Sequence, residues 1–176
     1  MKRPTVSAPE VKTLIARLAR EIDRRNRGVG DLALVGIKRR GVPLARRLAA
    51  LISNKRGTDV PVGAMDITLY RDDLQLVAET PIVRGSEIGF DLNDRIVVLV
   101  DDVIFTGRTV RAAMSELLDF GRPQAIQLAV LVDRGHRELP IQPDFVGRKV
   151  STRPQDLVDI CLAEEDGRDG VFVTRR

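Results

Sequence analysis

The sequence predicts an α/β protein whose central twisted sheet is mainly parallel and is flanked by helices. Short, nearly continuous apolar runs, such as residues 97–100 and 125–132, are typical of strands that are buried on both faces. Stretches with apolar residues at helical spacing alternate with these runs, as in the repeated βα units of parallel sheets. Polar loops follow the runs, at the carboxyl edge of the sheet where α/β proteins bind ligands.

The amino-terminal part of the chain predicts a helix, a strand and a second helix. Residues 7–10, Ser-Ala-Pro-Glu, have the form of a capping box, and apolar residues then recur at helical spacing until Asn26-Arg-Gly28 ends the helix. Residues 32–37 are expected to form a buried strand, residues 38–41 a loop, and residues 42 to about 52 the second helix. Together they make one βα unit.

A longer strand and an irregular segment follow. Residues 60–70 alternate between apolar and polar side chains, which indicates a strand. Residues 71 to about 93 are polar and have no helical period. About twenty irregular residues in a compact domain are typical of a functional element, so we expect a flexible flap hairpin over about residues 70–93.

The second half of the chain repeats the strand and helix pattern. Residues 97–109, Val-Val-Leu-Val-Asp-Asp-Val-Ile-Phe-Thr-Gly-Arg-Thr, run from a buried strand through two carboxylates into a turn. A helix from Thr109 to Phe120 and a buried strand over residues 125–132 come next. The helix is expected to turn these side chains inward: Val110, Ala113, Met114, Leu117 and Leu118.

The carboxyl-terminal part predicts three short strands. They are expected around Phe145, over residues 158–162 and over residues 171–173. The last two are joined through a turn that contains Glu-Glu-Asp-Gly. No linker or repeat interrupts the chain, so we expect one domain over residues 1–176.

Composition narrows the class of protein. With 43% hydrophobic and 31% charged residues and no apolar run near the 18 residues of a membrane span, the 176-residue chain is typical of soluble proteins. The amino terminus does not resemble a secretory signal, and the single cysteine, Cys161, cannot form an internal disulfide, so we expect a cytoplasmic protein. A formal charge of +4 carried mainly by arginine suits phosphate-bearing partners.

Residues 97–109 also predict a binding site. Where the turn becomes a helix, the backbone N–H groups of Phe105 to Thr109 and the positive end of the helix dipole can hold a phosphate. Asp101 and Asp102 would repel that phosphate, and are better suited to accept hydrogen bonds from sugar hydroxyls or to hold Mg²⁺ through water. The alternative is a strand-end turn with a helix cap. Together with the basic loop at residues 38–41, the pattern describes a phosphorylated ribose that carries a second phosphate group.

The string at residues 97–109 resembles the 5-phosphoribosyl-1-diphosphate signature of the type I phosphoribosyltransferases. Further strings, among them VGIKRRG, DITLYRDDL, GRTVRAAM and LVDRGHRELP, resemble one branch of that family: the bifunctional pyrimidine-operon attenuators that are also uracil phosphoribosyltransferases. The resemblance runs from about Leu14 to about Val173. It implies the type I phosphoribosyltransferase fold with its flexible flap.

The resemblance implies an enzyme that forms UMP and diphosphate from uracil and 5-phosphoribosyl-1-diphosphate with Mg²⁺. Catalytic residues are expected at Asp101, Asp102, Arg40 and Arg137, and the two aspartates are expected to hold the metal through water. Substrate-binding residues are expected at Arg39, Arg40, Gly41, Arg71, Val103, Ile104, Phe105, Thr106, Gly107, Arg108, Thr109, Asp133, Arg134 and Val158. The only histidine, His136, is interpreted as a structural hydrogen-bonding residue and not as a general base.

The same branch binds operon leader RNA through a basic face of a homo-oligomer. The first helix carries arginines three and four residues apart, and two further basic residues could extend that face: the expected RNA-binding set is Arg17, Arg20, Arg24, Arg27, Arg148 and Lys149. A charge stripe can also be plain solvated surface. Arg20, Gln142, Ser151 and Arg39 depart from the residues common in the branch.

Two other functions stay open at this stage. The first is an RNA-binding regulator that uses the nucleotide pocket only as a sensor. The second is a transferase for a purine base, which the loop after Val132 disfavours because it follows the pyrimidine branch.

Overall fold

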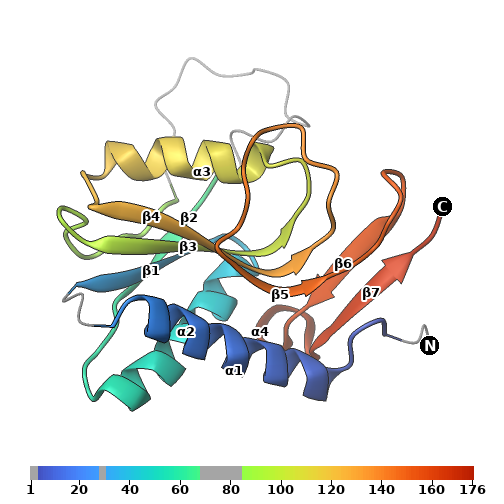
Figure 1. Cartoon of the computed structure of the whole chain (residues 1–176), viewed down its shortest axis with the longest axis horizontal. Helices are drawn as coiled ribbons and strands as arrows, with labels where there is room; N and C mark the ends of the chain where they lie inside the picture. Colours follow the sequence, from blue (N-terminus) through green and yellow to red (C-terminus); the bar gives the residue numbers. More distant parts are fainter. Residues whose placement is uncertain (1–3, 28–30, 68–84) are drawn as a thin grey trace.

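The computed structural model describes residues 4–27, 31–67 and 85–176, and its core is a parallel sheet. The five strands of that sheet lie in the order β2-β1-β3-β4-β5, and every neighbouring pair is parallel (Figure 1). Their bounds are Leu32–Ile37 for β1, Val62–Met65 for β2, Ile96–Ile104 for β3, Ala125–Asp133 for β4 and Phe145–Lys149 for β5. The predicted α/β class with its parallel sheet is confirmed.

Helices cover both faces of the sheet. The helices α1 (Ala8–Arg25) and α2 (Gly41–Arg56) lie on one face, and α3 (Arg108–Asp119) lies on the other (Figure 1). The predicted capping box starts α1, since Glu10 accepts hydrogen bonds from the backbone N–H and the hydroxyl of Ser7 at 2.8 and 2.7 Å. The first helix therefore begins where the sequence indicates.

The second helix is longer than predicted. It continues past residue 52 to Arg56 and ends at Gly57, whose φ of +69° closes the helix in the left-handed conformation. Its polar last turn stays helical because the buried Asp23 of α1 binds both Lys55 and Arg56 at 2.7 Å. An ion-pair network between two helices is not visible in hydrophobic periodicity.

Three further expectations need correction. Of the strand predicted over residues 60–70, the structure describes only Val62–Met65 as strand, and residues 68–70 lie outside the described residues. The strand β3 runs on to Ile104, so Asp101 and Asp102 lie within it and not after it. On α3, Leu118 is 56% exposed although it was expected inward, while Glu116 is buried and accepts a hydrogen bond from Ser86.

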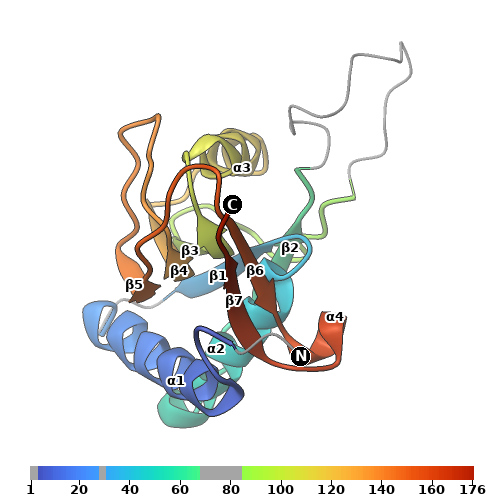
Figure 2. The same ribbon diagram turned by 90° about the vertical axis from the view of Figure 1, so that its right-hand side faces the viewer.

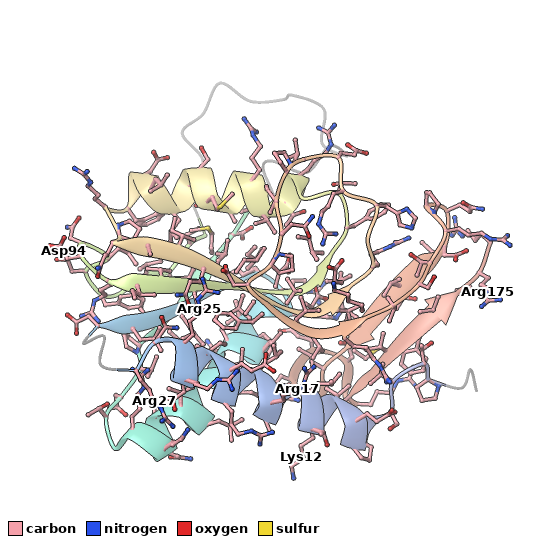
Figure 3. The ribbon with its side chains drawn as sticks, viewed as in Figure 1. Lys12, Arg17, Arg25, Arg27, Asp94 and Arg175 are labelled. Carbon is pink, nitrogen blue, oxygen red and sulfur yellow. The ribbon has the colours of Figure 1, made fainter. Side chains whose placement is uncertain are left out.

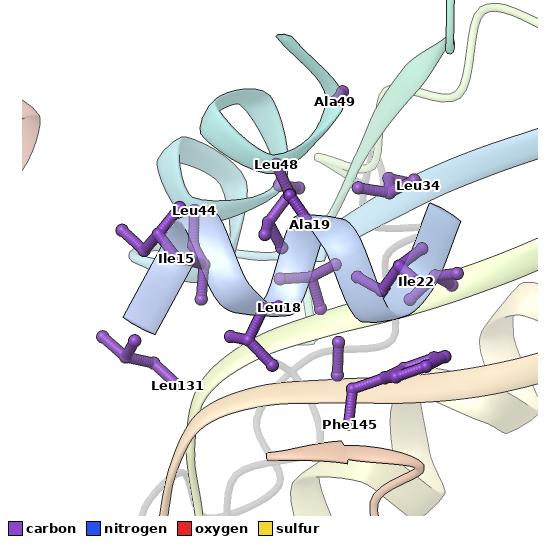
Figure 4. Close-up of a cluster of buried hydrophobic side chains, with 14 of the residues drawn as sticks. Ile15, Leu18, Ala19, Ile22, Leu34, Leu44, Leu48, Ala49, Leu131 and Phe145 are labelled. Atoms are coloured by element: carbon purple, nitrogen blue, oxygen red, sulfur yellow. The ribbon is translucent and has the colours of Figure 1, made fainter. Parts of the chain in front are cut away.

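Within the described residues, the hydrophobic core consists of two clusters, one on each face of the sheet. Figure 4 shows the first, in which Ile15, Leu18 and Ile22 of α1 pack with Leu44 and Leu48 of α2. Sheet residues that include Leu34, Leu131 and Phe145 complete it. The second cluster lies beneath α3 and includes Leu99, Val110 and Leu117. Burial on both faces explains why the strands read as continuous apolar runs.

A separate hairpin follows the sheet in the sequence. It consists of β6 (Leu157–Cys161), the short helix α4 (Ala163–Asp166) and β7 (Gly170–Thr174), and its strands are antiparallel. Val6, just before α1, pairs with Val171 of β7. Figure 2 shows the hairpin in front of the sheet, with α4 near α2. The predicted short strands at the carboxyl-terminal end are confirmed.

Within the described ranges, no helix combines the length and the hydropathy that crossing a membrane requires.

Candidate active site

A crevice lies at the carboxyl edge of the sheet, where the strand order changes direction. The chain passes from β1 to β2 on one side and places β3 on the other, and such a switch point is the usual ligand site of an open α/β sheet. The crevice has a volume of about 460 Å³, within the range of small-molecule sites. Its lining residues are Ile37, Lys38, Arg39, Arg40, Asp66, Ile67, Asp101, Asp102, Val103, Thr109, Val158, Asp159 and Ile160.

The turn between β3 and α3 presents free backbone donors. Gly107 precedes α3 with a φ of +94°, which lets the chain turn sharply into the helix. No described residue accepts a hydrogen bond from the backbone N–H of Thr106, Gly107 or Thr109. Three unpaired donors beside the positive end of a 12-residue helix form a site for an anion such as a phosphate.

Two adjacent carboxylates stand beside this turn. Asp101 is buried, and its Oδ1 accepts the backbone N–H of Asp102 at 2.9 Å. The Oδ1 of Asp102 accepts the N–H of Val103 at 2.8 Å. Burial raises the pKa of the Asp102 carboxyl, against the opposing effects of hydrogen bonding with the Asp101 side chain and the Val103 N–H and of the positive charge on Arg40. Both side chains line the crevice, so they can accept hydrogen bonds from the hydroxyls of a bound sugar.

The loop after β1 supplies the positive charge. Lys38, Arg39 and Arg40 line the crevice, and Gly41 starts α2 directly behind them. The Nζ of Lys38 donates to the backbone oxygen of Gly85, which ties this loop to a residue of the predicted flap. Arg40 forms a two-bond ion pair with Asp166 of α4, and this pairing raises the pKa of Arg40. Arg39 is far more exposed and lies 3.6 Å from Glu165.

The sequence predicts that the loop after β4 lies beside the base, but none of its residues is among those that line the crevice. Its polar side chains bind protein atoms. Arg137 donates to the backbone oxygens of Phe105 and Ile141 at 2.9 and 3.0 Å and binds Asp133 at 2.8 Å. Arg134 lies over the ring of Phe105, 4.0 Å from its centroid. Arg137 was expected among the catalytic residues, and its contacts favour a role in holding the turn at Phe105.

Arg134 and His136 also serve the loop itself. One nitrogen of Arg134 donates to the backbone oxygens of Arg153 and Asp156 at 3.0 and 2.8 Å, and burial lowers its pKa. The Nε2 of His136 lies 2.7 Å from the backbone oxygen of Thr152. The structural hydrogen bond predicted for this histidine is confirmed.

The structure brings part of the predicted site together in the lining of the crevice. Arg39, Arg40, Asp101, Asp102, Val103, Thr109 and Val158 line one crevice. Ile104 is instead 1% exposed in the core, and the side chain of Arg108 pairs with Glu138. Arg71 and residues 70–84 of the predicted flap lie outside the described residues. Asp66 and Asp159 also line the crevice and were not predicted, although Asp66 follows the strand β2 as Asp101 follows an apolar run in the sequence.

The predicted RNA-binding residues lie on α1, just after it, and on β5. Arg20, Arg24 and Arg27 are exposed, whereas Arg17 donates to the backbone oxygens of Val146 and Gly147 and so joins α1 to β5. Figure 3 shows Arg17 and Arg27 along the same side of the molecule as α1. Arg148 lies 3.2 Å from Glu10, and Lys149 is exposed beside it.

An anion site at the start of α3, next to a crevice lined by two carboxylates and a basic loop, is an arrangement suited to a phosphorylated sugar. Residues 6–164 match the phosphoribosyl transferase domain family. The bifunctional protein PyrR of Deinococcus deserti is 55% identical over 97% of this chain and 93% of its own length. That of Pelotomaculum thermopropionicum is 56% identical over 93% of this chain and 90% of its own length. The chain belongs to the phosphoribosyltransferase family, in the branch of the bifunctional PyrR proteins.

Solved structures agree on the fold. A hypoxanthine-guanine phosphoribosyltransferase from Bacillus anthracis superposes with a TM-score of 0.74 over 100% of this chain and 99% of its own, at 15% identity. The hypoxanthine phosphoribosyltransferase of Trypanosoma cruzi gives a TM-score of 0.74 over 99% of this chain and 97% of its own, at 16% identity. At identities this low, the similarity shows the fold and does not indicate which base is the substrate.

Proposed function

We propose that this protein transfers the 5-phosphoribosyl group of 5-phosphoribosyl-1-diphosphate to uracil, giving UMP and diphosphate. The observation that carries the proposal is the row of unpaired N–H groups at Thr106, Gly107 and Thr109 next to the carboxylates of Asp101 and Asp102. Together they provide donors for a 5′-phosphate at the start of α3 and acceptors for ribose hydroxyls in the crevice, and Thr109 lines the crevice itself. The PyrR relatives favour uracil over a purine as the base.

The reaction needs positioning and charge stabilisation. Uracil N1 forms a bond to the anomeric carbon as the bond to the diphosphate breaks, so negative charge grows on the leaving group and positive charge on the ribose. The negative charge on the diphosphate can be stabilised by Lys38, Arg39 and Arg40. The positive charge on the ribose can be stabilised by Asp101 and Asp102. Val158 also lines the crevice, where backbone groups of its segment can contact the base. Arg137 and Asp133 act indirectly, by fixing the turn at Phe105.

Magnesium fits this arrangement as a companion of the substrate. Among the described residues, no three histidine, cysteine or acidic side chains are grouped so that they could hold a metal by themselves. Mg²⁺ typically binds one or two protein carboxylates, water and substrate phosphates, and Asp101 and Asp102 offer such carboxylates. Bound there with the diphosphate, it would neutralise part of the leaving group's charge.

A second function is regulation of a pyrimidine operon through its leader RNA, with UMP in the crevice as the signal. The relatives are bifunctional, and Arg20, Arg24 and Arg27 leave exposed cations on one side of the molecule. Contacts to phosphates carry no sequence information, so the exposed arginine at position 20 can contribute to affinity for RNA whatever base contacts are made.

The test is the initial rate of UMP formation from uracil and 5-phosphoribosyl-1-diphosphate, with and without Mg²⁺, and with hypoxanthine or orotate in place of uracil. We expect metal-dependent turnover that is restricted to uracil. Turnover of hypoxanthine alone would refute the proposed base. UMP binding without any turnover would refute the enzymatic function and support the RNA-binding regulator, with the crevice as its UMP sensor.

A further inference from the structure

The turn between β6 and β7 is joined to the loop after β1 by acidic side chains. The Nε and Nη2 of Arg40 donate to the two carboxylate oxygens of Asp166 at 2.9 and 2.7 Å. Asp166 ends α4, more than 120 residues further along the chain. The contact therefore links the proposed diphosphate loop to the turn between β6 and β7.

Asp166 is itself held in place. Its Oδ2 also accepts the backbone N–H of Leu162 at 2.9 Å, which fixes the carboxylate within its own turn. Hydrogen bonding from Arg40 is the main cause that lowers the pKa of Asp166 to about 2, so the pair is charged at neutral pH. A carboxylate held at both oxygens restricts the rotation of the guanidinium it binds.

Two further ion pairs, both formed by Arg47, anchor the same turn through residues that do not line the crevice. Arg47, two turns into α2, binds Glu164 at 2.7 and 2.6 Å and Asp169 at 2.7 and 2.9 Å. Asp169 accepts the backbone N–H of Ala163 at 2.8 Å, in the same way as Asp166 accepts that of Leu162. The turn thus holds one arginine that lines the crevice and one that does not.

The ion pair leaves one side of Arg40 available. Asp166 occupies the edge formed by Nε and Nη2, and no described residue accepts a hydrogen bond from Nη1. Arg40 lines the crevice together with Asp102. An arginine fixed through one edge can present its remaining donors to a phosphate oxygen without losing side-chain entropy on binding.

We propose that Asp166 is a positioning residue that holds Arg40 ready for the diphosphate of the substrate. Arg39, its neighbour in the loop, provides a contrast: its side chain is 81% exposed and lies 3.6 Å from Glu165. The inference rests on the proposed phosphoribosyltransferase function. It assigns to the β6–β7 turn a role in substrate binding in addition to its packing.

The test compares two substitutions that are matched in chemistry. Asp166→Asn removes the carboxylate that pairs with Arg40, and Asp169→Asn removes one that pairs with Arg47. Each variant therefore loses one negative charge from the same turn and keeps an amide oxygen that can accept the backbone N–H. For Asp166→Asn we expect the KM for 5-phosphoribosyl-1-diphosphate to rise about fivefold while kcat and the KM for uracil change less than about twofold. For Asp169→Asn we expect a lower melting temperature and an unchanged KM.

A double substitution tests the path through Arg40. In an Arg40→Lys background, where no two-bond pair can form, Asp166→Asn should alter the KM by less than about twofold. Equal KM changes in the two single variants, or an undiminished effect in the Arg40→Lys background, would overturn the inference and leave the turn a purely structural strap.

Binding of diphosphate separates this inference from the proposed function. Titration calorimetry of the same variants with diphosphate and Mg²⁺ needs no uracil turnover. If the native protein binds diphosphate but does not make UMP, the proposed function fails, and a roughly fivefold weaker affinity in Asp166→Asn still supports the positioning role. An affinity equal to that of the native protein refutes it.

Discussion

Replacing Gly41 by alanine tests how the crevice is assembled. Gly41 is the first residue of α2 and lies against β3, directly behind the basic loop. A Cβ at this position would lie 2.4 Å from the backbone oxygen of Val100, where ordinary contacts begin near 3.4 Å. The obstacle is the backbone of a central strand, so the start of α2 would have to move by about 1 Å.

The size of that movement sets the expected effects. Crowding a methyl group against backbone in a well-packed interior costs up to about 3 kcal/mol of unfolding free energy. For a domain of this size, that lowers the melting temperature by about 10 °C. A displacement of about 1 Å in the residues that position a substrate can reduce kcat/KM about 100-fold. Stability and activity should therefore both fall in Gly41→Ala.

Thermal unfolding and steady-state UMP formation measure the two effects, and the other end of the same helix offers a control. Gly57 closes α2 with a φ of +69°, and a Cβ added there would meet no atom within 4 Å, so Gly57→Ala introduces backbone strain without a collision. It should cost about 1 kcal/mol and leave kcat/KM unchanged. A folded Gly41→Ala protein with native kcat/KM would refute the argument that close packing at β3 places the loop.

Three other predictions concern charge. Asp102→Asn should lower the rate of UMP formation about 100-fold. Burial raises the pKa of Asp102 in the folded state, so the stability that protonated Asp102 contributes is lost as the pH rises above the usual aspartate range. Urea unfolding should therefore show that Asp102→Asn loses less stability than the native protein as the pH is raised toward 8. The pKa of Asp166 is lowered to about 2, so its contribution to stability is present above the unfolded aspartate pKa and is lost between about pH 4 and pH 2. Over that pH range the free energy of unfolding should fall less steeply in Asp166→Asn than in the native protein. Replacing Arg20 and Arg24 by glutamine should reduce the slope of log affinity against log salt by about two units in filter binding with a leader stem-loop RNA, and an unchanged slope would remove them from the RNA face.

Much of the fold can be predicted from sequence because its signals are local. The capping box at Ser7 and Glu10 starts α1 as expected, and continuous apolar runs correctly indicate strands that are covered on both faces. The carboxyl ends of parallel strands meet at one edge, so strand assignments alone predict that the basic loop and Asp101 share a crevice.

The missed features depend on long-range contacts. Glu116 is buried on α3 because Ser86, thirty residues earlier, provides a hydrogen-bond donor, and no periodicity reports such a partner. Arg137 was predicted as a catalytic residue, and its contacts with Phe105 and Asp133 cannot be read from the sequence of its loop. The pairing of Arg40 with Asp166 joins two segments that are far apart in the sequence. The sequence shows that a charged residue requires a partner of opposite charge or a hydrogen-bonding group, and the fold shows which residue that partner is.

The most direct test of the account is a crystal structure of the protein with UMP. We expect the 5′-phosphate on the backbone N–H groups of Thr106, Gly107 and Thr109, and the ribose hydroxyls within hydrogen-bond distance of Asp101 or Asp102. UMP bound outside the crevice, for example beside Arg148 and Arg175, would contradict the assignment of this crevice as the active site.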